Sequence, residues 1–373
     1  MRRVWRCAGA EAAFLIGSGF ASGQEILQFF AAYGLARGLL GGLLAWGLLA
    51  WISVRVLTDA PGLGPGEKGH VFQLYCGRRI GAFLDGLTPL VLFGIYAVMV
   101  SGAGALVGEA WGVPPAVGRT AMLLAALGTV LLGLERLTDI IGAIGPVMIL
   151  LVAAVSLAAV VRSPEPVFRA AELAPTLPIP RPAGPWWLSG ILYAACNGYT
   201  LMPFLSGLSE QLPDRRSRFR AGAAGASAFG AAAILLQLGL TAWLKWVYAR
   251  EVPAVCLAEL LHPGLGRAFS ALMLAGVYTT AVPALWTACS RLSAGRGRFG
   301  LWAVILTAAA GLCGRLSFAG LVNRVYPGIG WCGAAVLACM LARSGFCGRR
   351  SPPGGGKESG RFRRRTRRRS PQA

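Results

Sequence analysis

Residues 7–33 read CAGAEAAFLIGSGFASGQEILQFFAAY, and this stretch decides the fold expected of the chain. It is long and apolar enough to cross a lipid bilayer, which needs about 20 residues. Gly17, Ser18 and Gly19 stand at its middle, and Glu25 follows two helical turns later. Glycine weakens a helix, and a carboxylate inside a bilayer is costly unless it is paired or hydrated. We therefore predict that the first membrane helix is interrupted at Gly17–Gly19 and that a binding site lies at the interruption.

The composition is that of a protein that crosses the membrane many times. Of the 373 residues, 55% are hydrophobic and 14% are charged, with a mean hydropathy of +0.60. Soluble domains are about 25% charged. Apolar runs predict ten membrane-spanning helices in an all-α fold. Their approximate ranges are 7–30, 35–57, 81–107, 114–134, 138–161, 186–208, 219–243, 268–290, 299–314 and 317–342.

Basic residues predict the orientation of these helices. The net charge is +21, and the chain ends in RFRRRTRRRSPQA. Lys and Arg concentrate in the loops on the N-terminal side of the membrane, which places both termini in the cytoplasm. The tail, residues 343–373, cannot bury a core, so we expect it to be disordered and to contact anionic lipid rather than nucleic acid.

The chain divides into two halves of five helices, residues 1–161 and 186–342. Between them, residues 162–185 hold seven prolines and predict an external linker without a helix. The interruption in the first helix has a counterpart in the sixth, at residues 196–198. An odd number of helices in each half gives the halves opposite orientations in the membrane. Inverted repeats with interrupted helices at matching positions are typical of transporters with a midplane site.

Two segments carry a resemblance to a known family. GSGFASGQEILQFF at residues 17–30 resembles the first-helix signature of the YkvI-type bacterial membrane proteins. LVNRVYPGIGW at residues 321–331 resembles that family's last helix. The family is similar to the amino acid–polyamine–organocation transporters, which implies a LeuT-like fold with five plus five helices and a bacterial cytoplasmic membrane location. The resemblance does not supply a substrate.

In the first helix, Ser18, Ser22 and Glu25 share one face. With Gly17, Gly19 and Phe20 they form the predicted substrate-binding segment, where free N–H groups of an interrupted helix can receive a carboxylate. The alternative is that these glycines only allow close helix packing.

Glu25 has three possible roles: a proton carrier, a counter-charge to a cationic substrate, or a structural partner of Arg324. Arg324 is the basic residue that lies well inside a predicted span. Glu11 lies nearer the cytoplasmic side, where we expect its side chain to reach the membrane surface or cap a helix.

The sixth helix carries polar residues on one face, followed by Pro203. We predict that Asn197, Gly198, Tyr199 and Thr200 bind substrate at a local break. The alternative is that the polar side chains form ordinary bonds between helices. Tyr96 in the third helix is a further candidate for gating, with packing in the core as the alternative.

In the eighth helix, Thr279 and Thr280 precede Pro283. In LeuT-like proteins, a pair of hydroxyl residues on this helix joins first-helix carbonyls in a sodium site. The resemblance therefore implies that Thr279 and Thr280 hold Na⁺. The alternative is that both hydroxyls bond to their own helix.

These features predict a secondary transporter of a small polar or zwitterionic solute, for example an amino acid, coupled to Na⁺ or H⁺. The alternatives are a ligand receptor that does not transport and a channel or structural membrane protein. No nucleotide-binding or catalytic motif is present, so we expect neither an enzyme nor a cofactor other than the coupling ion.

Overall fold

A computed structural model describes residues 1–15, 20, 22–62, 70–132, 138–293 and 297–347. The predicted residues Gly17, Ser18 and Gly19 lie outside the described part of the chain, as do residues 348–373 of the basic tail.

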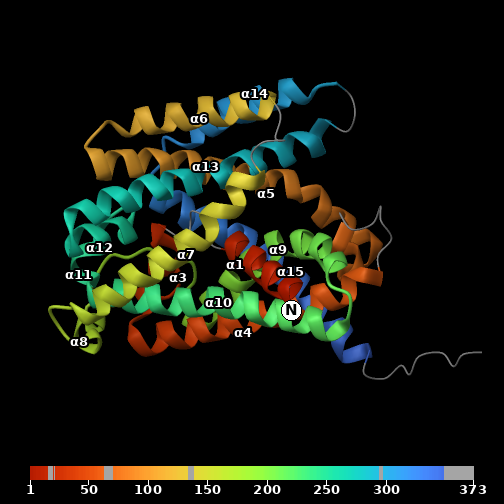
Figure 1. Cartoon of the computed structure of the whole chain (residues 1–373), viewed down its shortest axis with the longest axis horizontal. Helices are drawn as coiled ribbons and strands as arrows, with labels where there is room; N and C mark the ends of the chain where they lie inside the picture. Colours follow the sequence, from red (N-terminus) through yellow and green to blue (C-terminus); the bar gives the residue numbers. More distant parts are fainter. Residues whose placement is uncertain (16–19, 21, 63–69, 133–137, 294–296, 348–373) are drawn as a thin grey trace, which may run out of the picture.

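The described residues form α-helices and short 3-10 turns and no β-strand (Figure 1), so the predicted all-α class is confirmed. Six of these helices are long and apolar enough to cross a membrane: α4, α5, α6, α10, α13 and α15. The helices are α1 (Arg2–Leu15), α3 (Gln24–Phe29), α4 (Leu35–Asp59), α5 (Val71–Trp111), α6 (Pro115–Leu132), α7 (Thr138–Val161), α8 (Val167–Glu172), α9 (Trp186–Leu208), α10 (Arg215–Ala242), α11 (Leu244–Val247), α12 (Pro253–Leu261), α13 (Pro263–Ser293), α14 (Phe299–Cys313) and α15 (Phe318–Cys347).

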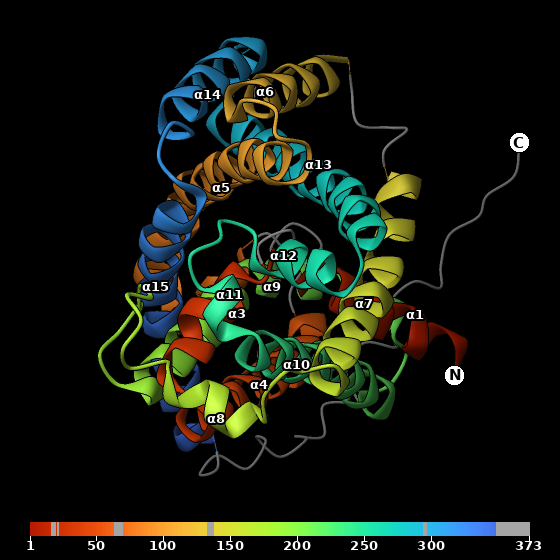
Figure 2. The ribbon, with the colours of Figure 1, turned by 90° about the vertical axis from the view of Figure 1, so that its left-hand side faces the viewer.

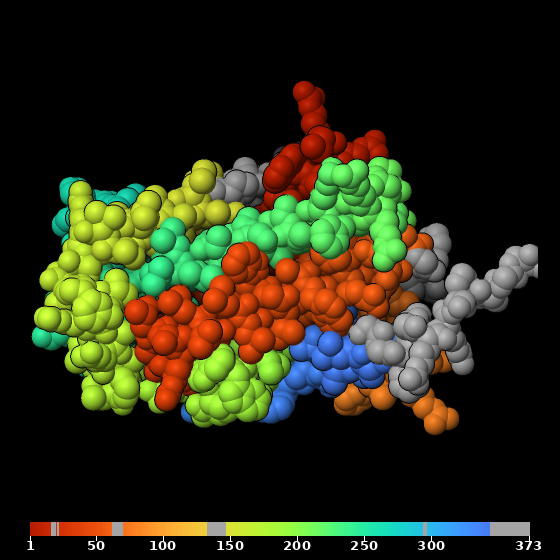
Figure 3. Space-filling view, turned by 90° about the horizontal axis from the view of Figure 1, so that it is seen from below, coloured from red at the N-terminus to blue at the C-terminus, as the bar shows by residue number. Residues whose placement is uncertain are grey.

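The long helices form two groups (Figures 1 and 2). In the first group, α4 packs against α9 and α10, and α1 and α3 pack beside them. In the second group, α5 packs against α6 and α13, and α14 covers α6 and α13. α15 contacts α9 of the first group and α5 of the second, while α7 contacts α10 and α13, so these two helices connect the groups. Figure 3 shows α4 and α10 side by side across one face of the first group.

The outer surface is apolar over much of its extent. Leu132 is 90% exposed and Leu150 is 72% exposed. Such a surface would be costly in water, but it suits the hydrocarbon of a bilayer, and the chain is therefore a membrane protein.

Small residues allow α4 and α15 to approach α9 closely. A Cβ atom at Gly190 would lie 2.7 Å from the Gly41 carbonyl oxygen, where α9 meets α4. At the contact of α15 with α9, a Cβ atom at Gly333 would lie 2.0 Å from the Ala195 carbonyl oxygen. Because the obstacle in both cases is backbone, no rotamer change could make room.

The predicted break in the sixth helix is wrong, because α9 runs without interruption from Trp186 to Leu208. The Asn197 side chain donates to the Tyr193 carbonyl at 3.0 Å, and the Thr200 hydroxyl donates to the Asn197 carbonyl at 3.0 Å. Both polar groups are therefore satisfied within their own helix. Pro203 removes a single backbone bond, which α9 tolerates.

Two further boundaries differ from those predicted. The linker 162–185 contains a helix, α8, which begins directly after Pro166. α15 extends to Cys347, so its last turn includes residues assigned to the tail.

The tight contact at Gly333 gives a first testable prediction. Gly333→Ala should lower the free energy of unfolding by about 1–3 kcal/mol, since the added methyl group overlaps backbone and forces α15 away from α9. Gly328→Ala, in the same helix, is the matched control because nothing lies within 4 Å of its Cβ position. Thermal unfolding of both variants in detergent measures the difference, and equal melting temperatures would contradict the packing described.

Candidate functional site

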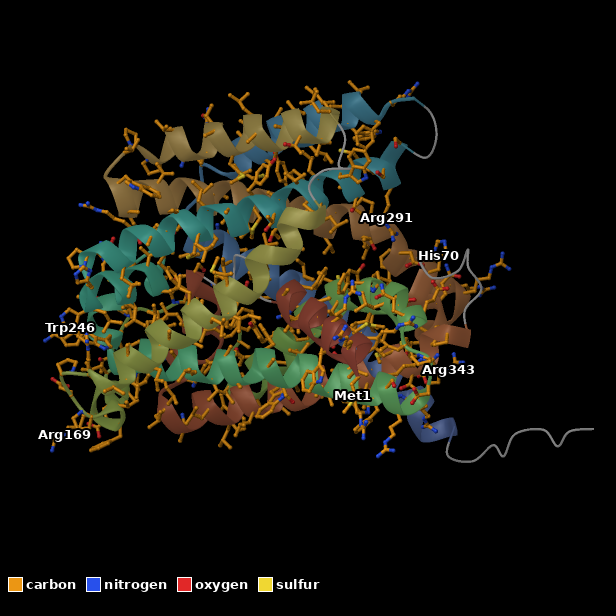
Figure 4. The ribbon with its side chains drawn as sticks, in the orientation of Figure 1. Met1, His70, Arg169, Trp246, Arg291 and Arg343 are labelled. Atoms are coloured by element: carbon orange, nitrogen blue, oxygen red, sulfur yellow. The ribbon has the colours of Figure 1, made fainter. Side chains whose placement is uncertain are left out.

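A cavity of about 970 Å³ lies between the two helix groups. It reaches the surface beside Trp5, Arg6 and Gln211, all of which are exposed, and it extends inward to the buried side chains of Glu25 and Tyr326. Arg291 also lines it. Figure 4 shows Arg291 toward the end of the molecule that holds His70 and Arg343, whereas Arg169 and Trp246 lie at the opposite end.

The segment leading to Glu25 changes direction at Gly23, which has a φ of +80°, a value that favours glycine. A side chain there would also meet Ala254 of α12, since a Cβ atom would lie 3.0 Å from the Ala254 nitrogen. α1 ends at Leu15 and α3 begins at Gln24. The first predicted span therefore contains two separate described helices, and α3 carries Glu25 to the inner end of the cavity.

The Glu25 carboxyl lies within interaction range of the hydroxyls of Tyr193 on α9 and Tyr326 on α15. The Tyr193 hydroxyl is buried, and the Glu25 carboxyl is the polar group beside it. The Tyr193 ring also packs against Phe30 with a centroid distance of 4.9 Å and against Phe29 at 5.2 Å. The inner end of the cavity thus combines one carboxyl group with aromatic rings and two tyrosine hydroxyls.

The predicted pair of Glu25 with Arg324 is wrong. Arg324 is exposed, whereas Glu25 is 7% exposed and interacts with Tyr326. Positions 324 and 326 are separated by about 200° around a helix, so only one of them can face α3.

Asn197 and Thr200 line the cavity, and Tyr199 reaches across it. The Tyr199 hydroxyl donates to the Leu84 carbonyl on α5 at 2.6 Å, which joins the two helix groups. The Tyr199 ring also stacks on Phe72, with a centroid distance of 4.5 Å. Gly198 instead faces Ile52 of α4, and its role is close packing.

Thr279 and Thr280 line the same cavity from α13, together with Pro283. Both threonine hydroxyls donate to the Gly276 carbonyl, at 2.9 and 3.1 Å. In this conformation they satisfy the backbone of their own helix. Their use as sodium ligands stays a prediction, because each hydroxyl keeps lone pairs that could face an ion.

Three other predicted residues do not line the cavity. Phe20 is 1% exposed and packs against Phe229 with a centroid distance of 5.1 Å. Ser22 is buried, and its hydroxyl accepts a bond from the Gln24 nitrogen at 3.1 Å, which supports the turn before α3. Tyr96 is fully buried in the core.

Comparisons with known proteins agree with this arrangement. No family model matches the chain. The membrane protein YkvI of Bacillus subtilis, which is uncharacterised, is 20% identical over 332 residues, covering 88% of this chain and 92% of that protein. The manganese transporter of Eremococcus coleocola aligns with a TM-score of 0.54 and 15% identity over 92% of this chain and 77% of that structure. MhsT in complex with L-phenylalanine aligns with a TM-score of 0.56 and 15% identity over 91% of this chain and 89% of that structure.

The fold is LeuT-like. Its two groups of helices enclose the cavity, and the first predicted span contributes both a wall, α1, and the inner carboxyl, Glu25 on α3.

Tyr326 was not among the site residues predicted from sequence. It stands in LVNRVYPGIGW, the segment that carried the family resemblance, directly before Pro327. The available signal was periodicity: Tyr326, Ile329, Gly330 and Gly333 share one helical face, and that face meets α9.

The bond between Tyr199 and Leu84 gives a second prediction. Tyr199→Phe should lower the free energy of unfolding by about 1 kcal/mol, because a buried hydrogen bond between the two helix groups is lost. Tyr248→Phe is the control, since its hydroxyl makes no hydrogen bond to a described residue. Chemical unfolding in detergent measures both variants. A Tyr199→Phe variant as stable as the wild type would show that this bond does not hold the groups together.

Proposed function

We propose that the chain is a secondary transporter of a small polar or zwitterionic solute with an apolar part, working by alternating access in a bacterial cytoplasmic membrane. The observation that carries this proposal is the cavity between the two helix groups, which reaches the surface beside Trp5 and ends at buried Glu25. Its volume of about 970 Å³ suits a small molecule.

The chemistry of the cavity supports a solute with two parts. Phe14 and Phe204 stack in its wall with a centroid distance of 4.6 Å, and Ile95 and Met99 add apolar surface. Polar groups gather farther in, around Glu25 and Asn197. An apolar side group would contact the wall, and a polar head would reach the inner end.

The opposite end of the molecule is closed by hydrogen bonds, as alternating access requires. The Gln28 side chain donates to the Ala319 carbonyl at 3.0 Å, and the Ala319 nitrogen donates to the Glu251 carboxylate at 2.8 Å. The Glu109 carboxylate accepts bonds from the nitrogens of Glu251 and Val252, at 2.8 and 3.2 Å. These bonds connect α3, α5 and α15 through the segment before α12.

Basic residues indicate which side the cavity faces. Its mouth lies beside Arg6, near the N-terminus, and the loops on that side carry the larger share of Lys and Arg. By the positive-inside rule this side is cytoplasmic, so the conformation described is open to the cytoplasm. The coupling ion is Na⁺ or H⁺, with Thr279 and Thr280 as the sodium candidates.

Solute binding tests the proposal directly. The apparent melting temperature of the purified protein is measured across amino acids and small metabolites, in Na⁺ and in K⁺. We expect at least one solute to raise it, because a ligand that binds only the folded state adds about 2.7 kcal/mol at 100 times its Kd. Glu25→Gln should abolish that shift, and Glu165→Gln, on the exposed linker, should retain it.

Uptake into proteoliposomes distinguishes a transporter from a receptor. A solute that stabilises the protein should also accumulate in the vesicles under an ion gradient. Binding without accumulation would favour a receptor on the same fold. A shift that requires Na⁺ and is lost in the Thr279→Ala and Thr280→Ala variants would assign the sodium site.

A further inference from the structure

Glu11 is a second buried carboxyl group, and it does not line the cavity. It stands in the C-terminal half of α1 and is 0% exposed. Both of its carboxyl oxygens are buried without a hydrogen-bond partner among the described residues. α1 turns Ala10 and Ala13 toward the cavity, whereas Glu11 lies on another side of the helix, toward α4 and α10. The expectation that Glu11 reaches the membrane surface is therefore wrong.

A notch in α10 accommodates this carboxyl group. A Cβ atom at Gly225 would lie 2.5 Å from Glu11 Oε2 and 2.9 Å from the Ala8 carbonyl oxygen, so only glycine leaves room. Ser53 of α4 lies beside the carboxyl, and its buried hydroxyl also lacks a partner among the described residues. The site thus has a fitted shape and unused hydrogen-bonding capacity.

No described basic group neutralises Glu11. On α1, Arg6 is exposed at the mouth of the cavity. On α4, Arg55 pairs with Asp59 at 3.5 Å. On α10, Arg218 donates to the Leu212 carbonyl at 3.2 Å, and Arg220 is exposed. α9 and the described side chains of α7, residues 147–161, carry no charged group, and the remaining titratable neighbour is Cys7.

An ionised carboxylate in this position would lose its hydration and gain no counter-charge, with the Ser53 hydroxyl as its single donor, which costs several kcal/mol. A proton on the carboxyl removes the charge and supplies a donor for the Ser53 hydroxyl. We propose that Glu11 is a proton-binding site that is occupied while α1 packs against α10 with Ser53 of α4 beside the carboxyl, and that movement of α1 hydrates the carboxyl and releases the proton. The release of the proton by movement of α1 rests on the proposed transport function and makes H⁺ the coupling ion.

Infrared spectroscopy of the reconstituted protein detects the protonation state of Glu11 whether or not any solute is known. The spectrum of Glu11→Gln is subtracted from that of the wild type at neutral pH. We expect the difference to contain the carbonyl stretch of a protonated carboxylic acid, and Ser53→Ala should shift the frequency of that band. Loss of a carboxylate stretch instead would overturn the proposal, as would an absent shift in Ser53→Ala.

Folding of the variant is checked by its melting temperature. The amide is an uncharged isostere of the protonated acid, so Glu11→Gln should keep the wild-type melting temperature at neutral pH. Glu11→Lys should lower the melting temperature, because it buries a charge at the same position. If Glu11→Gln does not fold, site-specific isotope editing of Glu11 in the wild type identifies the same band.

Proton coupling is then measured with a pH-sensitive dye in proteoliposomes and a solute found by the stability screen. Glu11→Gln should still bind that solute but lose solute-driven proton uptake, and retained uptake would overturn the coupling. If no solute binds at all, the transport proposal fails while the infrared result still decides the protonation of Glu11.

Discussion

A bilayer offers no hydrogen-bond partners to buried polar groups, and the structure depends on how the first 33 residues meet this constraint. Two carboxyl groups, Glu11 and Glu25, are buried there without a basic partner among the described residues. One lies against a glycine notch beside Ser53, and the other meets two tyrosine hydroxyls at the inner end of the cavity. Both environments need helices from distant parts of the chain, so these two groups determine which helices must assemble around α1 and α3.

The helices themselves could be predicted from sequence, because hydropathy follows the thickness of the bilayer directly. Predicted and observed ranges differ mainly at their ends, as with α5, which begins at Val71 and carries a non-helical Gly77 before the predicted span. The continuity of α9 could not be predicted in the same way. Asn197 beside Gly198 is compatible with a break or with a helix, and the choice depends on whether the amide bonds within its own turn, as it does with Tyr193.

The candidate site was predicted in part, and the errors have a common cause. Sequence identifies which polar residues lie at membrane depth, so Asn197, Thr200, Thr279 and Thr280 were found, and all four line the cavity. It does not identify which side of each helix faces a partner. Arg324 was considered as one possible partner of Glu25 because it is a basic residue well inside a predicted span, although Tyr326, on another side of α15, occupies that position. The small residues at 221–226 of α10 carried a usable signal, since such stripes permit close approach by another helix.

The two carboxyl groups lie on consecutive helices that flank the same cavity. α1 presents one side to the cavity and another to α4 and α10, so any displacement of α1 that changes the cavity mouth also changes the surroundings of Glu11. Glu25 follows the left-handed Gly23, and α3 is held by Gln28 to the closed end of the molecule. We therefore expect α1 to move in the proposed cycle while α3 stays in place. Under the proposed function, Glu25 would interact with the solute and Glu11 would report the position of α1, which is the separation of roles that coupled transport requires.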